Sequence, residues 1–291
     1  MNADTRSLRE RLFITMQHLL PQHLLSRLTG VLARSGFQPL KDWLIRHFIA
    51  RFAVDMSEAA EPDPAAYPHF NAFFTRALRE GMRPVDAAPQ AITSPADGAV
   101  SQLGAIEDGR IFQAKGHWFS AAELLADPAD ARLFANGSFA TIYLSPRDYH
   151  RVHMPLGARL RTLRYVPGKL FSVNQVTAES VPGLFARNER LVCLFDTEHG
   201  PLAMVLVGAM VVAGIETVWT GPVTPAGRQV LNVDYELDAA ARTLEKGAEM
   251  GRFQLGSTVI LLLPPGVASW DEALAAGSPL RMGQRIGSLS N

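Results

Sequence analysis

The sequence predicts an α+β fold in which a β-rich body follows an N-terminal group of amphipathic helices. Two patterns predict it. Before residue 54, apolar residues recur at steps of three and four, which is typical of helices with one apolar face. After Pro84, short apolar runs alternate with glycine and proline, which is typical of strands joined by turns. With 47% hydrophobic and 19% charged residues among 291, the chain falls in the globular class and outside the disordered one.

The first helical stripe runs over Leu8–Leu32 and is interrupted at Pro21, which is expected to kink or split the helix. A second stripe covers Leu40–Phe52, and a third, short helix is expected around His69–Leu78. Residues 1–54 carry eight basic and three acidic side chains, in a chain whose formal net charge is zero. Such helices lie on an anionic membrane surface or pack on the protein's own core, and the pattern leaves both interpretations open.

The strands of the body are predicted from runs of Val, Ile, Leu and aromatic residues between glycines and prolines. They are Gly98–Ile106, Arg110–Ala114, Ser138–Leu144, Arg159–Val166, Leu191–Phe195, Val230–Leu237 and Ser257–Leu263. Gly200–Ile215 is too short for the roughly 20 residues of a membrane span and predicts buried strands with a tight turn. Ser120 and Glu123 have the spacing of a capping box, which predicts one short helix. We expect a helical region over 1–80 and a β-rich domain over 81–291.

Charge and cysteine content exclude several classes of protein. Zero net charge removes any whole-protein electrostatic argument for nucleic acid, so no nucleic-acid partner is expected. Cys193 is the one cysteine, which excludes an internal disulfide framework and any multi-cysteine metal site. Its apolar neighbours predict a buried, inert thiol in a core strand.

Polar residues interrupt the strand pattern in three segments. Asp97 stands in a turn at the head of a strand, and by itself this pattern is an ordinary Asp-Gly turn. His150 and His153 follow another strand, and together with Asp97 they raise the hypothesis of a metal site. Flanking prolines leave too little room for the helix that would put both rings on one face, so no metal is expected.

The third segment contains Gly256 and Ser257 at the entrance to an apolar strand. Because glycine has no side chain, the carbonyl of Gly256 is uncrowded. A serine with a histidine base and an orienting aspartate can attack an acyl carbon. If the nearest carbonyl belongs to the preceding peptide bond, the product is an ester within the chain. A strand that merely begins with Gly-Ser remains the alternative.

Taken together, these segments resemble the phosphatidylserine decarboxylase family, in order over roughly residues 90–262 and more loosely through the N-terminal helices. A four-residue match such as Leu255–Thr258 is weak evidence by itself, but the full set of segments in the same order is specific. The resemblance rests on Ser94–Gly98, Asp148–Pro155, Tyr165–Gly168, Phe171–Asn174, Phe185–Arg190, Gly214–Trp219, Lys246–Phe253 and Leu255–Thr258.

The resemblance implies a proenzyme that cuts itself between Gly256 and Ser257, giving a β subunit (1–256) and an α subunit (257–291). Ser257 would become a covalent pyruvoyl group, the only cofactor, with His153 as the base that activates it and Asp97 orienting His153. The pyruvoyl group would form a Schiff base with phosphatidylserine, and loss of CO₂ would lead to phosphatidylethanolamine. His150 is the candidate acid that protonates the former α-carbon.

The resemblance also implies partners and a location. Phosphatidylserine and membrane lipid are expected partners, residues 1–80 would be the membrane-associating region, and residues 81–291 the catalytic domain. The protein would lie peripherally on the cytoplasmic face of the cell membrane, as a homodimer of the processed pair. Two alternatives are a lipid hydrolase, disfavoured because no Gly-x-Ser-x-Gly surrounds Ser257, and a non-enzymatic membrane-binding module. Of these interpretations, only the decarboxylase predicts that the chain runs as two fragments on a denaturing gel.

Overall fold

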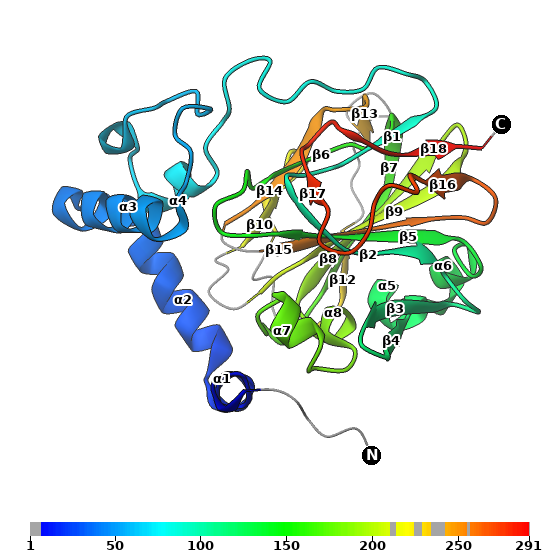
Figure 1. The fold of residues 1–291 in the computed structure, drawn as a ribbon, viewed down its shortest axis with the longest axis horizontal. Coiled ribbons are helices and arrows are strands. Elements are labelled where there is room, and N and C mark those ends of the chain that lie inside the picture. Colours follow the sequence, from blue (N-terminus) through cyan, green and yellow to red (C-terminus); the bar gives the residue numbers. More distant parts are fainter. Residues whose placement is uncertain (1–6, 210–213, 224–228, 234–241, 255–256, 291) are drawn as a thin grey trace.

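The computed structural model describes residues 7–209, 214–223, 229–233, 242–254 and 257–290. Helices gather in the N-terminal part of these residues, and a β-rich body follows them (Figure 1). The expected α+β fold class is therefore confirmed. All strand pairs in the named sheets are antiparallel.

The N-terminal helices follow the stripes in the sequence. They are α1 (Leu8–Leu19), α2 (Gln22–Ala33), α3 (Gln38–Phe52) and α4 (Phe70–Phe74), with a 3-10 turn η1 at Pro64–Ala66. Pro21 separates α1 from α2, as expected, because proline has no amide hydrogen for the helix ladder. Within the part of the chain that the structure describes, none of the helices has the length and hydropathy needed to span a bilayer.

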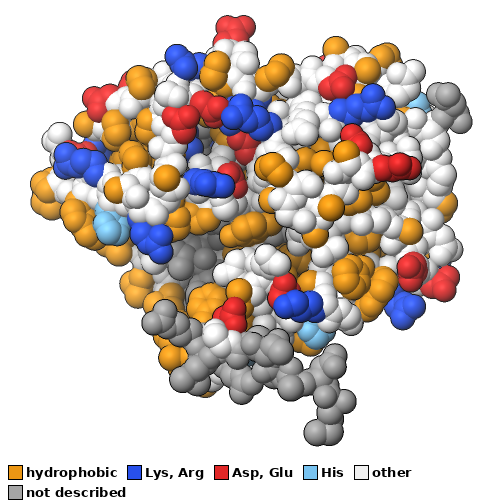
Figure 2. Space-filling model, viewed as in Figure 1, with side chains coloured by type: hydrophobic (Ala, Val, Ile, Leu, Met, Phe, Trp, Pro, Cys, Tyr) orange, Lys and Arg blue, Asp and Glu red, His pale blue; other side chains and the backbone are white. Residues whose placement is uncertain are grey.

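Most of the large apolar side chains of α1 and α2 are exposed. Seven of them are 48 to 78% exposed: Leu12, Met16, Leu19, Leu24, Leu28, Val31 and Leu32. Trp43 of α3 is 58% exposed, and Figure 2 shows hydrophobic side chains with Lys and Arg among them on the side where α3 lies. The first apolar stripe, on α1 and α2, is therefore largely exposed, whereas Leu44, Phe48 and Phe52 of the second stripe pack against a buried cluster.

Polar side chains of α1 and α2 face the body instead. Gln17 accepts a hydrogen bond from the Ser172 amide at 2.7 Å and donates one to Thr177 Oγ1 at 3.3 Å. Gln22 accepts from the Leu170 amide at 2.8 Å, and both glutamines are buried. This orientation is the inverse of an ordinary surface helix, whose apolar face packs inward.

The main sheet has the strand order β12-β7-β8-β9-β15-β5-β2-β17, with β13 also paired to β7. β15 lies in its centre and is buried along its whole length, which explains the continuous apolar run of its sequence. The strands are β2 (Gly98–Ala105), β5 (Ser138–Leu144), β7 (Ala158–Val166), β8 (Arg190–Thr197), β9 (Gly200–Val207), β12 (Leu231–Val233), β13 (Thr243–Leu244), β15 (Ser257–Leu263) and β17 (Pro279–Leu280).

Three smaller sheets and four short helices complete the described body. The strands are β6 (Arg151–His153), β10 (Ile215–Thr217), β11 (Gly221–Pro222) and β14 (Glu249–Phe253) in one sheet, β1 (Ala91–Thr93), β16 (Ala268–Trp270) and β18 (Arg285–Leu289) in another, and β3 (Arg110–Ala114) paired with β4 (His117–Ser120). The helices are α5 (Ala121–Leu125), α6 (Pro128–Arg132), α7 (Gln175–Ala178) and α8 (Leu184–Arg187). α5 begins with the expected capping box of Ser120 and Glu123.

Each face of the main sheet carries its own cluster of buried apolar side chains. Val259 and Leu261 of β15 belong to one cluster, which also contains Phe253 of the smaller sheet. Ile260 and Leu262 belong to the other, which lies against α5 and α8. A third cluster packs α4 on α3 and contains Ile45, Tyr67, Phe70, Phe73 and Phe74.

The expected strands are confirmed to within two residues at each end, except Val230–Leu237, of which residues 234–237 lie outside the described ranges. In Gly200–Ile215, residues 210–213 lie outside them as well. α4 is shorter than the helix expected around His69–Leu78, because the chain beyond it turns to hydrogen-bond with residues 58–60. Cys193 is fully buried, as expected, and burial raises the pKa of its thiol.

Candidate active site

The main sheet brings the starts of β2 and β15 to the same end of the sheet, on either side of the last residues of β5. Ser257 begins β15 and pairs with Leu144, while Ala99 of β2 pairs with the adjacent Tyr143. Because neighbouring strands lie about 4.8 Å apart, β2 and β15 are about 10 Å apart here. The chain leaves β5 at this end of the sheet, and the segment that follows contains His150 and leads into β6, which ends at His153.

Arg83 holds Asp97 in the turn before β2. Its Nε donates to both carboxylate oxygens, at 2.8 Å and 3.0 Å, and the Met282 amide donates to Oδ1 at 2.8 Å. Gly98 follows with a φ of +153°, and a Cβ there would lie 2.2 Å from the carbonyl oxygen of Tyr143. Glycine is therefore needed for this turn to approach β5 so closely.

His153 is buried, and both of its ring nitrogens are hydrogen-bonded. Nδ1 lies 2.8 Å from the Gly247 carbonyl oxygen and Nε2 lies 3.1 Å from the Tyr149 hydroxyl. Since a carbonyl can only accept, Nδ1 carries the hydrogen and Nε2 is the basic nitrogen. Burial lowers the pKa of His153 and raises that of Tyr149 to about 12, so both groups are neutral at pH 7.

Asp97 and His153 share no hydrogen bond among the described residues, although the triad interpretation has Asp97 orient the ring. Gly247 and Tyr149 fix the ring instead. The two segments are still joined, because the His153 amide donates to the Pro95 carbonyl at 2.8 Å. Glu249 and, to a smaller extent, Asp97 act on His153 as negative charges that favour the protonated ring.

His150 is fully buried under α4. Its ring centroid lies 4.0 Å from that of Phe74, and its Nδ1 lies 2.8 Å from the Asp148 carbonyl oxygen. The carbonyl places the hydrogen on Nδ1, which leaves Nε2 as an acceptor without a partner among the described residues. Burial lowers the pKa of His150 to about 3, so the ring is neutral at pH 7 and its Nε2 carries no proton.

Ser257 is fully buried, and its Oγ has no hydrogen-bond partner in the described part of the chain. Most buried hydroxyl groups are hydrogen-bonded, so an unpaired one calls for a functional explanation. The Gly256 carbonyl, which the cleavage hypothesis requires, lies outside the described residues.

A family model described as phosphatidylserine decarboxylase matches residues 70–288, a span that contains Asp97, His150, His153 and Ser257. The chain belongs to the phosphatidylserine decarboxylase family. A second model, described as PSD, matches residues 12–53, which cover α2, α3 and most of α1. Membership confirms the expected enzyme class, a carboxy-lyase, and disfavours both the lipid hydrolase and the non-enzymatic binding module.

Known relatives match along almost the whole chain. A phosphatidylserine decarboxylase proenzyme of Pseudomonas fluorescens is 62% identical over 284 residues, which cover 96% of this chain and 98% of that protein. One from Pseudomonas putida is 62% identical over 283 residues, with 96% and 98% covered. One from Ectopseudomonas mendocina is 60% identical over 282 residues, with 96% and 99% covered.

Two residues at this candidate site were missed in the sequence. Tyr149 lies inside the segment singled out for its histidines, and its hydroxyl was overlooked beside the two imidazoles. Arg83 stands 14 positions before Asp97, and no periodic pattern connects them. Their pairing depends on the tertiary fold, in which Glu58 also bonds Arg83 at 2.7 Å.

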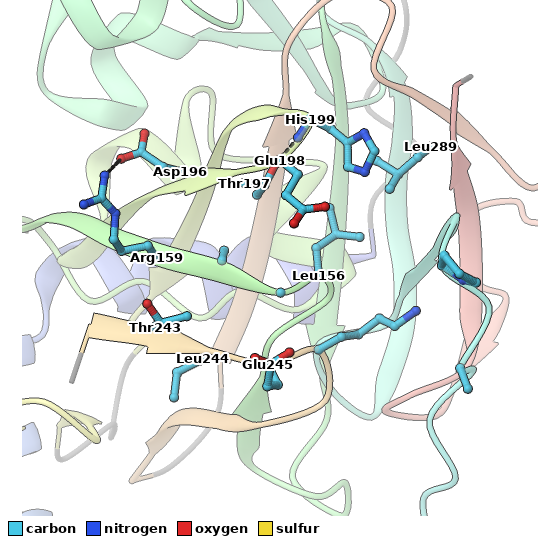
Figure 3. Close-up of a pocket in the computed structure, with 15 residues that line it drawn as sticks. Leu156, Arg159, Asp196, Thr197, Glu198, His199, Thr243, Leu244, Glu245 and Leu289 are labelled. Atoms are coloured by element: carbon cyan, nitrogen blue, oxygen red, sulfur yellow. Dashed lines mark hydrogen bonds and ion pairs between the residues drawn. The ribbon is translucent and has the colours of Figure 1, made fainter. Parts of the chain in front are cut away.

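The cavities of this family member differ in their relation to the site. One of about 540 Å³ lies beside β7, β8 and β13, with the Arg159–Asp196 ion pair at one wall (Figure 3). None of the four predicted site residues lines it. A smaller cavity of about 250 Å³ is lined in part by Arg83, Tyr149 and Met282, and so adjoins the groups that hold Asp97 and His153.

The described residues contain no group of three or more His, Cys, Asp or Glu side chains that could hold a metal ion. His150 and His153 illustrate why their spacing makes no shared site. Their Nδ1 atoms bond different carbonyl oxygens, those of Asp148 and Gly247. Each histidine therefore has its own environment.

Proposed function

We propose that the chain converts phosphatidylserine to phosphatidylethanolamine with a pyruvoyl group made from its own Ser257. The proposal includes self-cleavage between Gly256 and Ser257 into a β subunit (1–256) and an α subunit (257–291). One observation carries it. In a chain of the phosphatidylserine decarboxylase family, the buried Ser257 Oγ has no partner among the described residues and stands at the fixed start of a central strand.

In the proposed self-cleavage, Ser257 Oγ attacks the carbonyl carbon of Gly256 while Nε2 of His153 takes the hydroxyl proton. The amide bond is thereby replaced by an ester. Removal of the Cα proton of Ser257 then breaks its Cβ–O bond, and Gly256 leaves as a carboxylate. Water replaces the nitrogen of the remaining dehydroalanine, ammonia departs, and a ketone is left at the start of the α subunit.

Asp97 supports this step as a fixed negative charge in our proposal. Arg83 and the Met282 amide hold its carboxylate in place. His153 becomes positively charged when it takes the serine proton, and a nearby carboxylate stabilises that charged form. The orientation of the ring is left to Gly247 and Tyr149.

The start of β15 would hold the pyruvoyl group, because its pairing with Leu144 of β5 fixes this end of the strand. When present, the pyruvoyl group would supply a ketone that condenses with the substrate amine, with loss of water, and that accepts the electron pair left by CO₂. His150 supplies the proton transfers. Its bare Nε2 takes a proton from the substrate ammonium group, which becomes the nucleophile, and returns one to the α-carbon after decarboxylation.

A denaturing gel and the intact mass of the purified wild-type protein test the proposal. We expect two fragments, the larger of about 28 kDa in proportion to 256 of 291 residues and 31.7 kDa. The smaller fragment should be lighter than one beginning with serine by the mass of ammonia, because the serine nitrogen is lost. A single intact chain that still decarboxylates phosphatidylserine would exclude the pyruvoyl group.

We infer that α1, α2 and α3 lie on an anionic lipid surface and hold the protein peripherally on the cytoplasmic face of the cell membrane. Exposed leucines on α1 and α2 and the exposed Trp43 of α3 occur together with four exposed arginines, which suits an acyl boundary beneath anionic headgroups. The exposed arginines are Arg27, Arg34, Arg46 and Arg51. The proposal includes a homodimer of the processed pair, which sedimentation in detergent would measure.

Leu19→Ser combined with Leu24→Ser should weaken binding to phosphatidylglycerol vesicles about 100-fold or more. Each leucine withdrawn from water contributes about 1.5–3 kcal/mol, and these two are 78% and 55% exposed. Flotation of vesicles measures the bound fraction. Leu133→Ser is the matched control, because Leu133 is 39% exposed beside α6. Equal binding by the double variant and the wild type would show that α1 and α2 do not contact the lipid.

A further inference from the structure

Several buried polar groups near the start of β15 lack hydrogen-bond partners among the described residues. They are Nε and Nη1 of Arg76, Oδ1 of Asn71, Nε2 of His150 and Oγ of Ser257. Asn71 connects these groups to β15, because its Nδ2 donates to Gln254 at 3.3 Å, three residues before Ser257. Native proteins leave few buried polar groups unpaired, so this cluster indicates a site built for a polar ligand.

Arg76 stands out because its unpaired group is charged. The residue is 4% exposed, and its Nη2 donates to the Arg147 carbonyl at 3.2 Å. Its guanidinium carbon lies 5.5 Å from the centroid of the Phe73 ring. Arg147 comes three residues after Leu144, the partner of Ser257 in the sheet. Arg76 therefore reaches the end of the sheet at which β15 begins.

No carboxylate forms an ion pair with Arg76 within the described structure. Glu58 and Asp97 both bond Arg83, and Asp148 accepts from the Ser145 amide at 2.6 Å. A buried guanidinium without a counterion destabilises a fold, and burial lowers the pKa of Arg76 for the same reason. Proteins keep such destabilising groups at functional sites. The missing partner of Arg76 is accordingly an anion that arrives with the substrate.

We propose that Arg76 binds the phosphodiester of the phospholipid headgroup. The substrate's other anion is the carboxylate, which loses its charge as CO₂ leaves. An arginine paired with it would become unpaired toward the transition state and so would oppose the reaction. The phosphodiester stays charged from substrate to product. The proposal rests on the proposed condensation of the substrate amine at Ser257. Because only a few covalent bonds separate the amine from the phosphodiester, this condensation brings the phosphodiester close to the start of β15.

Binding of the phosphodiester also changes the environment of His150. Burial is the main cause of the low pKa of His150, and the positive charge of Arg76 lowers it further. An anion paired with Arg76 offsets that charge. This offset raises the pKa of His150 and so favours the protonated ring during proton transfer.

Arg76→Met and Arg76→Lys test the proposal with two water-soluble probes. Dihexanoylphosphatidylethanolamine carries a phosphodiester and no carboxylate, and O-hexyl-L-serine carries a carboxylate and no phosphodiester. By calorimetry, Arg76→Met should weaken binding of the first probe about 10- to 100-fold and leave the second unchanged. Arg76→Lys should be intermediate, since it keeps the charge but loses the planar fork. Arg132→Met, at an exposed site on α6, is the control.

Thermal stability separates a binding role from a structural one. Arg76→Met should melt at the same or a higher temperature, because it removes an uncompensated buried charge. A lower melting temperature with unchanged affinity for both probes would overturn the proposal, and so would weakened binding of O-hexyl-L-serine alone. If Arg76→Met does not fold, Arg76→Lys carries the comparison. Repeating the titrations in a Ser257→Ala background, which cannot form pyruvoyl, keeps this test independent of the proposed function.

Discussion

Ser257→Ala is expected to yield one intact chain of 31.7 kDa without decarboxylase activity. The substitution removes the only atom that can attack the preceding carbonyl, and with it the source of the pyruvoyl group. The fold should survive, because alanine fits an extended strand and the Ser257 Oγ has no hydrogen bond to lose among the described residues. A denaturing gel, a melting curve and an activity assay with phosphatidylserine measure the three expectations.

Ser138→Ala provides the matched control. Ser138 lies on β5 opposite Leu263, at the other end of β15, and its Oγ also has no partner among the described residues. We expect this variant to cleave and turn over as the wild type does. Cleavage of the Ser257→Ala chain at the usual position, or activity from its uncut form, would refute the proposed origin of the pyruvoyl group.

His150→Ala and His153→Ala should fail at different stages. His153→Ala is expected to remain uncut, because Nε2 of His153 is the proposed base for Ser257. His150→Ala should still cleave, at least in part, but turn over about 10²–10⁴-fold more slowly, the usual loss when a proton-transfer group is removed. Intact mass distinguishes the two variants. An uncut His150→Ala chain beside a normally cleaved His153→Ala chain would reverse the roles.

The pH dependence of self-cleavage offers an independent check on His153. Protonation of Nε2 removes the proposed base, so the rate should fall as the pH drops through the pKa of His153. Burial lowers that pKa from the ordinary value of 6.5, so cleavage should persist below pH 6.5 and be lost only in more acidic solution. A rate that already falls above pH 7 would point to another base.

Local patterns predicted much of the fold because they depend on neighbouring residues alone. Pro21 splits the first helix, and Ser120 caps α5, for reasons contained within four residues of chain. The apolar run Ser257–Leu263 similarly marks a strand that is buried on both sides. The segments that surround the site were also found in this way.

Contacts between side chains far apart in the sequence could not be predicted from such local patterns. Arg83 pairs with Asp97, and Tyr149 with His153, through geometry that no sequence spacing encodes. Periodicity located the apolar stripe through Leu12 but could not say what it faces, because the decisive contact is the hydrogen bond from the Ser172 amide to Gln17, 155 positions away. Tertiary structure decides which side of an amphipathic helix packs inward.

The position of β15 has a consequence for the mature enzyme. The proposed cut before Ser257 would turn the central strand into part of a separate polypeptide that pairs with β5 on one side and β9 on the other. Losing it would open two facing sheet edges, which readily capture other strands. Unfolding then becomes a dissociation, so the melting temperature should rise with protein concentration. On the proposed cleavage, the sheet would form while the chain is still whole, and a denatured enzyme would have to rebuild it from two separate polypeptides.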